Sequence, residues 1–258
     1  MAHSTEFGIK RDTAPGAAPP TIHEQQRFWD WHWQHWQDRR AINEWALHRG
    51  ERVLNMLRGL ALDRPRILDM GCGIGWFSHD FSRFGDVTGI DLSEEAIAKA
   101  RARYPHITFR TGNVLSEALP AGHFDVGVSQ EVLAHVDDQA MFVRAAATVL
   151  RPGGYLILTT VNRIVVDRLG TAAWEPWPRE HIEHYLDMKD LKRLLRPHFR
   201  VRQATTVLPL GDAGILRLIN SHKLNKTLSR LIPQRSLDAL KERAGFGYFL
   251  LVLAQKRA

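Results

Sequence analysis

The sequence contains little cysteine and lacks any long apolar run. Cys72 is its only cysteine, which excludes a disulfide within the chain and a cysteine-rich zinc site. No apolar stretch approaches the roughly 18 residues of a membrane-spanning helix. The N-terminal segment also lacks the apolar centre of a secretory signal. We therefore expect a cytoplasmic protein in a reducing compartment.

The remaining composition is that of an ordinary globular protein. Of the 258 residues, 44% are hydrophobic and 24% are charged, and the formal net charge is +7. A chain of this length buries roughly 70–75% of its unfolded surface, so its core needs no disulfide or metal for stability. The basic excess lies mainly in residues 211–258, which hold nine Lys and Arg against three Asp and Glu. Such an excess suits an anionic partner, either a nucleic acid or a membrane surface.

Periodicity divides the chain into three parts. Residues 1–20 are rich in Ala, Pro and Gly and predict a flexible tail. Residues 21–60 predict a helical lid, and residues 61–258 predict one α/β domain with a basic helical insertion at about 211–245. Short apolar strands alternate with helices in this domain, which is typical of a mostly parallel sheet with helices on both faces. The expected strands are Ile67–Met70, Val87–Ile90, Ile107–Phe109, Phe124–Ser129, Tyr155–Thr160, Phe199–Leu208 and Phe246–Ala254.

Several turns and helix starts can also be read from the sequence. A helix is expected over Phe77–Phe84, and Arg151–Gly154 is expected to form a turn. Ser93 can cap the helix that follows it, in which Glu95 and Lys99 are spaced as an i,i+4 ion pair. The remaining capping candidates are Asp137, Asp138 and Asp187.

Tryptophan is concentrated near the N-terminus. Trp29, Trp33 and Trp36 recur at i, i+4 and i+7, so they share one face of the predicted helix. Packing of this helix on the domain explains the shared face. Trp31 lies off that face, so packing explains it least well. Aromatic walls suit a flat or lipophilic ligand, or a cation. Trp174 and Trp177 mark a second candidate lid segment.

The segment ILDMGCGIGWFS runs from a predicted strand through three glycines into a predicted helix. Gly71, Gly73 and Gly75 let the backbone bend sharply and approach a ligand without side-chain interference. The start of the following helix directs N–H groups to the same point. A dinucleotide fingerprint has its third glycine three positions after the second, where this chain has Trp76. Asp69 would repel a pyrophosphate but suits a cationic ligand, either directly or by bracing the loop.

Four segments, in order along the chain, resemble one family. Asp-x-Gly-x-Gly-x-Gly at 69–75 resembles motif I of the class I S-adenosylmethionine (SAM)-dependent methyltransferases, and VTGIDLSEEAIAKAR at 87–101 resembles their second-strand motif. FDVGVSQEVLAHVDD at 124–138 and LRPGGYLILTT at 150–160 resemble their fourth- and fifth-strand motifs. The resemblance covers about residues 45–210. It implies a Rossmann-like seven-stranded sheet with an antiparallel last strand, SAM as cofactor and S-adenosylhomocysteine (SAH) as its product.

The resemblance also implies which residues bind the cofactor. Asp91 is placed to grip the ribose hydroxyls, because a carboxylate can accept two hydrogen bonds from a diol. Leu92 can pack on adenine, Asn113 is placed like the family's polar adenine contact, and Gln130 is placed near the methionine end. Many relatives have Asp instead of Asn at the adenine contact. No sequence feature indicates an activated thiol at Cys72. The predicted set is Asp69, Gly71, Cys72, Gly73, Gly75, Asp91, Leu92, Asn113, Val114 and Gln130.

Methylation of a hydroxyl group needs a base, and the sequence offers several candidates. His135 follows the fourth predicted strand, and Glu131 lies one helical turn earlier. In the segment HIEHYLD, His181 and Tyr185 are spaced i,i+4, and His184 lies between them. We expect His135 to be the base. No carboxylate-rich magnesium site of the catechol type can be assembled, so no metal is expected.

The sequence predicts a SAM-dependent methyltransferase that acts on a small, aromatic or lipophilic acceptor. It resembles the ubiquinone-pathway and natural-product O-methyltransferases, which favours oxygen as the acceptor atom. N- or C-methylation of a small molecule, including an anionic isoprenoid, stays open.

Other functions also remain as alternatives. The segment SQEVLAHV lacks the Asn/Asp-Pro-Pro-aromatic motif of amino-directed DNA and RNA enzymes, which argues against a nucleic-acid substrate. A SAM-binding protein without activity is a third class. Residues 223–232 have an apolar and a basic face, which suits peripheral contact with an anionic membrane surface. The oligomeric state is open, and a homo-oligomer is one alternative.

Overall fold

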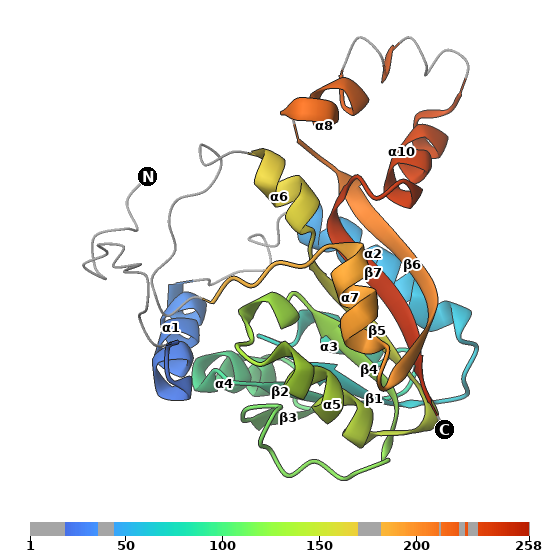
Figure 1. Ribbon diagram of the computed structural model, residues 1–258. Helices are drawn as coiled ribbons and strands as arrows, with labels where there is room; N and C mark the ends of the chain where they lie inside the picture. Colours follow the sequence, from blue (N-terminus) through green and yellow to red (C-terminus); the bar gives the residue numbers. More distant parts are fainter. Residues whose placement is uncertain are drawn as a thin grey trace.

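The computed structural model describes residues 19–35, 44–169, 182–211, 213–221, 225–226 and 232–257. Within them the strands are β1 (Arg66–Met70), β2 (Asp86–Asp91), β3 (Thr108–Thr111), β4 (Phe124–Gln130), β5 (Leu150–Val161), β6 (Phe199–Pro209) and β7 (Gly247–Lys256). These strands form one sheet in the order β3-β2-β1-β4-β5-β7-β6 (Figure 1). β7 is antiparallel to both of its neighbours, and the other neighbouring pairs are parallel. The predicted fold class is therefore confirmed, including the antiparallel last strand.

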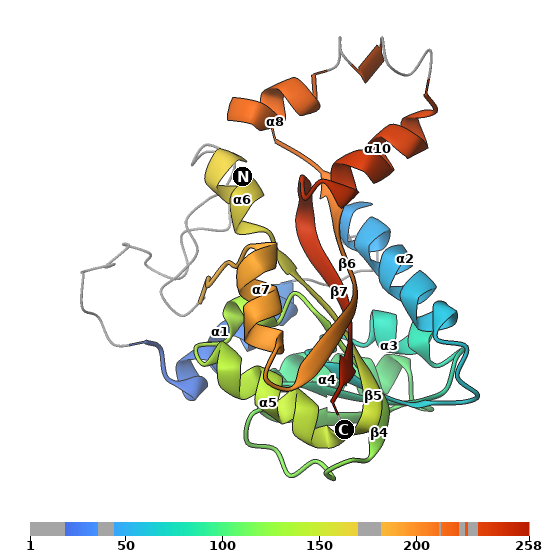
Figure 2. The ribbon, with the colours of Figure 1, turned by 45° about the vertical axis from the view of Figure 1, so that its right-hand side comes forward.

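Helices cover both faces of the sheet. They are α1 (Ile22–His35), α2 (Glu44–Gly59), α3 (Trp76–Phe81), α4 (Glu94–Arg103), α5 (Gln139–Val149), α6 (Arg163–Leu169), α7 (Met188–Leu195), α8 (Gly214–Ile219), α10 (Gln234–Arg243) and the short 3-10 helix η2 (Leu133–His135). α2, α3 and α4 share one apolar core through Val53, Phe81 and Ile97. α5 and α7 belong to a second core through Phe142 and Leu191. α6, α8 and α10 extend beyond the sheet, at the top of Figure 2.

None of the helices that the structure describes is long and apolar enough to cross a lipid bilayer.

Three helices begin at capping residues that the sequence predicts. Ser93 Oγ accepts a hydrogen bond from the N–H of Ala96 at 3.1 Å, at the start of α4. Asp138 caps α5 and Asp187 caps α7 in the same way, each with a donor–acceptor distance of 2.8 Å. Such caps satisfy N–H groups that have no partner within the helix, and each contributes about 1 kcal/mol to stability. The local sequence therefore sets where these helices begin.

Two local predictions are wrong in extent. The turn expected at Arg151–Gly154 belongs to β5. The pairing of β4 with β5 shifts register between Phe124 and Val126, so these turn-forming residues lie opposite an irregularity within the strand pair. The helix expected over Phe77–Phe84 ends at Phe81. The N–H groups of Arg83 and Phe84 bond to carbonyls three residues back, which tightens the last turn and ends the helix.

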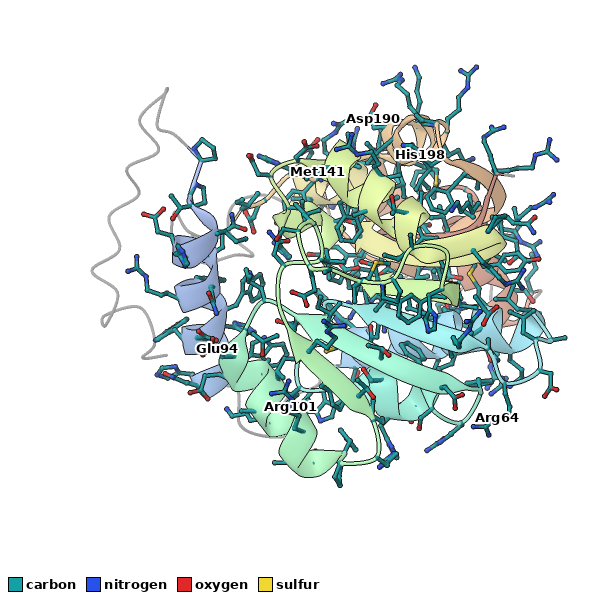
Figure 3. All side chains as sticks on the ribbon, turned by 90° about the horizontal axis from the view of Figure 1, so that it is seen from below. Arg64, Glu94, Arg101, Met141, Asp190 and His198 are labelled. Carbon is teal, nitrogen blue, oxygen red and sulfur yellow. The ribbon has the colours of Figure 1, made fainter. Side chains whose placement is uncertain are left out.

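The structure gives Glu95 and Lys99 partners other than each other. The Lys99 ammonium donates to the carbonyl of Trp33, and Glu95 Oε1 accepts from Gln34 Nε2 at 3.2 Å. Both contacts hold α1 beside α4, as Figure 3 shows from below. An i,i+4 pair contributes only about 0.2–0.5 kcal/mol, so tertiary partners readily replace it.

The insertion between β6 and β7 is anchored by the buried carboxylate of Glu242 in α10. Glu242 is 4% exposed, and its Oε2 lies 2.7 Å from Nη2 of Arg52 in α2. Thr206 of β6 donates from Oγ1 to the carbonyl of Glu242 at 2.6 Å and accepts from the N–H of Gly247 at 2.8 Å. α10 is thus fixed to α2 and to the last two strands. The amphipathic segment predicted at 223–232 lies largely outside the described residues.

A basic face lies at the amino ends of the parallel strands. Residues 192–202 and 256–257 contain seven Lys and Arg and no Asp or Glu, a charge equal to the net charge of the chain, +7. These segments meet because Lys256 at the end of β7 pairs with Phe199 at the start of β6. In Figure 3 this region carries the labels Asp190 and His198, with nitrogen-tipped side chains around them. From the sequence we expected the basic excess in residues 211–258. The positive charge of residues 192–202 does not appear in that count, because acidic residues elsewhere in residues 1–210 balance it.

We predict that Thr206→Val lowers the free energy of unfolding by about 1–3 kcal/mol, because it leaves the buried N–H of Gly247 without its partner. Urea unfolding should show this as a lower midpoint with an unchanged slope. Thr205→Val is the matched control, since its Oγ1 contributes only a 3.3 Å contact with the next carbonyl. Equal midpoints for the wild type and Thr206→Val would show that Thr206 does not hold the strands and α10 together.

Candidate functional site

A cavity of about 480 Å³ lies at the carboxyl ends of the parallel strands. The glycine loop after β1 and the residues that follow β2 and β4 line one side of it. α1 and the first half of α2 line the other side. Open α/β sheets bind ligands at this edge, where the loops after neighbouring strands converge.

The glycine loop adopts a shape that glycine permits, and backbone hydrogen bonds hold it in place. Gly71, Gly73 and Gly75 have φ values of 78°, 52° and 80°, a region that residues with a Cβ rarely adopt. The N–H groups of Gly71 and Cys72 donate to the carbonyl of Ile90, at 2.8 and 3.0 Å. The N–H of Gly75 donates to the carbonyl of Cys72. The loop therefore offers a close approach to the backbone, whereas these amides are used within the protein rather than facing a ligand.

Asp91, at the end of β2, ties this loop to the neighbouring strand. Its Oδ2 accepts from the N–H of Gly73 at 2.8 Å, and its Oδ1 accepts from the N–H of Ser93 at 3.0 Å. Burial raises the pKa of Asp91, and these two hydrogen bonds act against that rise. A carboxylate has about four acceptor positions, so about two remain for hydroxyl groups in the cavity. Leu92 and Val114 line the cavity beside it and supply apolar surface.

Asp69 braces the loop from below. It is 3% exposed, and Ser78 in α3 donates to its Oδ2 at 2.5 Å. Burial raises the pKa of Asp69 to about 7, although the hydrogen bond from Ser78 lowers it, and the nearby Asp91 adds to the rise. Of the two alternatives left open by the sequence, the geometry favours the brace, because this carboxyl group joins the end of β1 to α3.

Arg49 of α2 is a candidate functional residue that sequence reasoning missed. Its side chain is 12% exposed, and its guanidinium lies 4.8 Å from the centre of the Phe249 ring and 4.0 Å from Glu131. Its Nε also donates to Gln130 Oε1 at 3.4 Å. Burial lowers the pKa of Arg49 and Glu131 raises it, but guanidinium remains charged in proteins. A fixed positive charge therefore lies beside Gln130, at the end of the cavity expected to receive the methionine part of the cofactor.

Trp76, the first residue of α3, supplies a second donor to the cavity. Its indole N–H is buried and has no hydrogen-bond partner among the described residues, and the residue lines the cavity. Buried polar groups are normally satisfied, so an unpartnered donor of this kind suits a ligand with an acceptor atom.

His135, at the end of η2, has the geometry of a neutral base. Its Nδ1 lies 2.8 Å from the carbonyl oxygen of Ile182. A carbonyl only accepts, so Nδ1 carries the proton and Nε2 is the basic nitrogen of the neutral ring. Burial lowers the pKa of His135, which keeps the ring neutral at pH 7. His135 lines the cavity, and Trp29 of α1 packs edge-on against it at 5.2 Å.

Glu131, at the end of β4, also lines the cavity and has an unusual backbone conformation. Its φ is 60°, which costs a residue with a side chain about 1–3 kcal/mol and is found mostly at functional sites. Thr159 Oγ1 donates to its carboxylate at 2.7 Å. Burial raises the pKa of Glu131, and the nearby Arg49 and the hydrogen bond from Thr159 lower it.

Nine of the ten predicted cofactor residues line the cavity; Gly75 is the exception. A Cβ at Gly75 would stand 2.7 Å from the Phe109 ring, so this glycine allows α3 to pack on β3. Asn113 uses its Oδ1 to accept from the N–H of Leu115 at 3.0 Å and thus shapes its own loop. Burial raises the pKa of the Cys72 thiol, which agrees with the absence of any sign of activation in the sequence.

The catalytic candidates separate into three groups. His135 and Glu131 line the cavity. His184 is exposed and Tyr185 donates to Glu183 Oε1 at 2.6 Å, and neither side chain lines the cavity. They are directed elsewhere because the backbone of this segment pairs with η2, where the N–H of His184 donates to the carbonyl of Ala134. His181 lies outside the described residues.

The tryptophans of α1 are distributed differently from the prediction. Trp29 and Trp33 line the cavity, whereas Trp31 does not and packs 4.8 Å from His35. The face of α1 that we ascribed to packing is thus also a wall of the cavity. Trp36, Trp174 and Trp177 lie outside the described residues. The α1 residues on this wall are Ile22, Gln25, Trp29, His32 and Trp33.

Comparison with known proteins shows which family this part of the chain resembles. Residues 68–158 match the family model of the methyltransferase domain. Over these residues the chain resembles the SAM-dependent methyltransferases. The match contains the glycine loop, Asp91 and the end of β4, so the expected resemblance and the expected cofactor are confirmed.

Relatives and solved structures extend the comparison beyond the matched segment. A ubiquinone biosynthesis O-methyltransferase of Albidiferax ferrireducens is 41% identical over 107 residues, which cover 38% of this chain and 42% of that protein. The similar region thus spans less than half of the curated relatives' length. A SAM-dependent methyltransferase structure from Mesorhizobium loti has a TM-score of 0.55 at 25% identity, covering 78% of this chain and 96% of that one. The N-methyltransferase NodS of Bradyrhizobium japonicum, solved with SAH, shares the fold, with a TM-score of 0.63 at 16% identity over 91% of this chain and all of that one.

The residues that line the cavity suit several chemical groups of SAM. The open acceptor positions of Asp91 suit the ribose diol, and Leu92 and Val114 suit the adenine face. The guanidinium of Arg49 suits the carboxylate of the methionine part. The cavity therefore offers groups that suit the ribose, the adenine and the carboxylate of the cofactor.

We predict that Asp91→Ala weakens SAH binding at least tenfold, about 1.4 kcal/mol, because it removes the acceptor for the ribose and releases the N–H of Gly73. Isothermal titration calorimetry measures the change. Asp86→Ala is the control: it removes a carboxylate from the other end of β2, which is 69% exposed and paired with Arg64. Unchanged affinity in Asp91→Ala, in a protein that melts normally, would contradict the site.

Asp69 predicts a pH dependence of stability. Its pKa of about 7 lies above the unfolded value of 3.8, so the folded state binds more protons between these values. This contribution to stability is therefore complete below about pH 4 and is lost as the pH rises towards 7. Asp69→Asn removes the dependence, so its stability relative to the wild type should increase from pH 4 to pH 8. Urea midpoints across this range measure it, and a difference that does not vary with pH would contradict the raised pKa.

Proposed function

We propose that this protein transfers a methyl group from SAM to an oxygen atom of a small, aromatic or lipophilic acceptor. The observation that carries the proposal is the neutral His135 in the same cavity as the cofactor residues. Its Nδ1–H is fixed by the carbonyl of Ile182, so its basic nitrogen is defined. A hydroxyl acceptor needs a group of this kind to take up its proton.

The chemistry that SAM supplies when bound is an electrophilic methyl group on a sulfonium. Asp91 would hold the ribose end of the cofactor and Arg49 its carboxylate end. His135 receives the hydroxyl proton at Nε2 and passes it to solvent after the transfer. α1 covers the cavity and limits water, and alignment of acceptor and methyl group in a dry site supplies most of the rate enhancement in such reactions.

The walls of the cavity indicate an acceptor with a flat or apolar body. Trp29, Trp45, Phe77, Tyr248 and Phe249 all line it. Aromatic rings of this kind contribute apolar area and favour edge-on or stacked contacts with a ring. The ubiquinone O-methyltransferases among the relatives are consistent with such a ligand, although they share only part of this chain.

Methylation of an amine is the second candidate, and Glu131 favours it. Its carboxylate lines the same cavity as the aromatic residues, and carboxylates and aromatic faces both attract a cationic amine, which loses a proton before it accepts the methyl group. An acceptor library that contains phenols and amines separates the two functions.

RNA methylation gains no support from the charge distribution. The basic face of residues 192–202 and 256–257 lies at the amino ends of the parallel strands, and the cavity lies at their carboxyl ends.

Contact with an anionic membrane stays a prediction. Ile215 and Leu218 of α8 favour it, being 54% and 67% exposed on either side of Arg217.

We predict that His135→Asn lowers the turnover number at least a hundredfold with little change in the affinity for SAH, since general bases contribute about 10²–10⁴-fold. Asparagine keeps an N–H donor for the carbonyl of Ile182 but has no basic nitrogen. The wild-type rate should be constant above pH 7 and fall towards acid pH below 6.5, because the pKa of His135 is lowered from 6.5.

His184→Asn is the matched control, because His184 is exposed and does not line the cavity. It should keep full turnover on the acceptors that the wild type methylates. Full activity in His135→Asn would remove this residue as the base. Binding of SAH without turnover on any acceptor in the library would favour the non-catalytic alternative.

A further inference from the structure

Asp30 on α1 reaches across to the cofactor side of the cavity. Its Oδ1 accepts from Ser93 Oγ at 2.6 Å and from the N–H of Glu95 at 3.2 Å. Ser93 in turn donates its own N–H to Asp91 Oδ1 at 3.0 Å. One residue therefore lies between the carboxylate on α1 and the carboxylate proposed to hold the ribose. We call Asp30, Ser93 and the N–H of Glu95 the Asp30 latch.

The helix that carries Asp30 contacts both halves of the site. A Cβ on Gly73 would stand 2.6 Å from the ring of Trp33, so this tryptophan packs directly on the glycine loop. Trp29, one turn earlier, packs against the proposed base His135 at 5.2 Å. Any movement of α1 would therefore change the cofactor side and the acceptor side together.

α1 is attached to the domain by both apolar and polar contacts. Phe28 is its one fully buried residue. Besides the Asp30 latch, α1 makes the hydrogen bond of Gln34 with Glu95 and accepts one from Lys99 at the Trp33 carbonyl. The Gln34 contact is exposed, and exposed polar contacts contribute little to stability. The latch and the Lys99 contact are both part-buried, and each includes a charged group, so their hydrogen bonds are of the stronger, charge-assisted kind.

We propose that Asp30 is a positioning residue whose latch holds α1 closed over the bound cofactor, so that release of the cofactor requires the latch to open. The inference rests on the proposed function, because it takes the cavity as the SAM site. It assigns Asp30 no contact with the reacting atoms. Lids that cover an active site commonly open before product release, and this step often limits turnover.

The test is the rate at which the protein releases SAH. Radiolabelled SAH is bound, an excess of unlabelled SAH is added, and the loss of bound label is followed. Asp30→Ala should release SAH at least five times faster than the wild type, because it lacks an acceptor for Ser93 and Glu95. Asp30→Asn keeps an acceptor oxygen at the same position but loses the charge, so its release rate should lie between those of the wild type and Asp30→Ala. Slower release from Asp30→Asn than from Asp30→Ala would show that the acceptor oxygen, and not only the negative charge, retains the cofactor.

Gln34→Ala is the matched control on the same helix, because it removes the exposed contact with the same Glu95, and it should release SAH at the wild-type rate. A wild-type release rate in Asp30→Ala would overturn the latch, even if its melting temperature were lower, because that pattern is expected of a helix cap alone. The readout needs no methyl acceptor. A protein that binds SAH but methylates nothing would therefore contradict the proposed function and leave this test intact.

Discussion

The carboxylate of Asp91 joins the loops on which the site is built. It accepts from Gly73 in the glycine loop and from Ser93 at the start of α4, so one side chain connects the loops that follow β1 and β2. The loop can take this position because its glycines adopt positive φ values, and Asp69 supports it from below through Ser78. Asp91 also lines the cavity, and its remaining acceptor positions are those proposed to hold the ribose.

The rest of the molecule positions groups around this centre. The parallel strands bring Asp91, Gln130 and Glu131 to one edge, and α2 adds the positive charge of Arg49. α1 covers the same edge, with an aromatic wall and with Asp30 bound at Ser93. The cofactor side and the acceptor side therefore share a wall, which explains how a short helix with one buried residue can matter for both.

Much of the cofactor half could be predicted from the sequence, because its signals are local. The glycine spacing, the strand ends at Asp91 and Gln130, and the caps at Ser93 and Asp187 each depend on a few neighbouring residues. Arg49 could not be found in this way, because its role depends on packing against Gln130 and Phe249, far along the chain. The same limit applies to Trp31 and Trp33. The sequence favours Trp31 as the ligand contact, but both residues fit a helix, and only tertiary packing decides which face meets the cavity. The basic face was missed because it combines two segments that lie far apart in the sequence.

The most direct test of the central claim is a crystal structure of the protein with SAH. The account predicts the nucleoside in the cavity beside the glycine loop, with both ribose hydroxyls on Asp91, the carboxylate towards Arg49, and the sulfur facing the space beside His135. A nucleoside bound elsewhere, or one whose ribose makes no contact with Asp91, would contradict it.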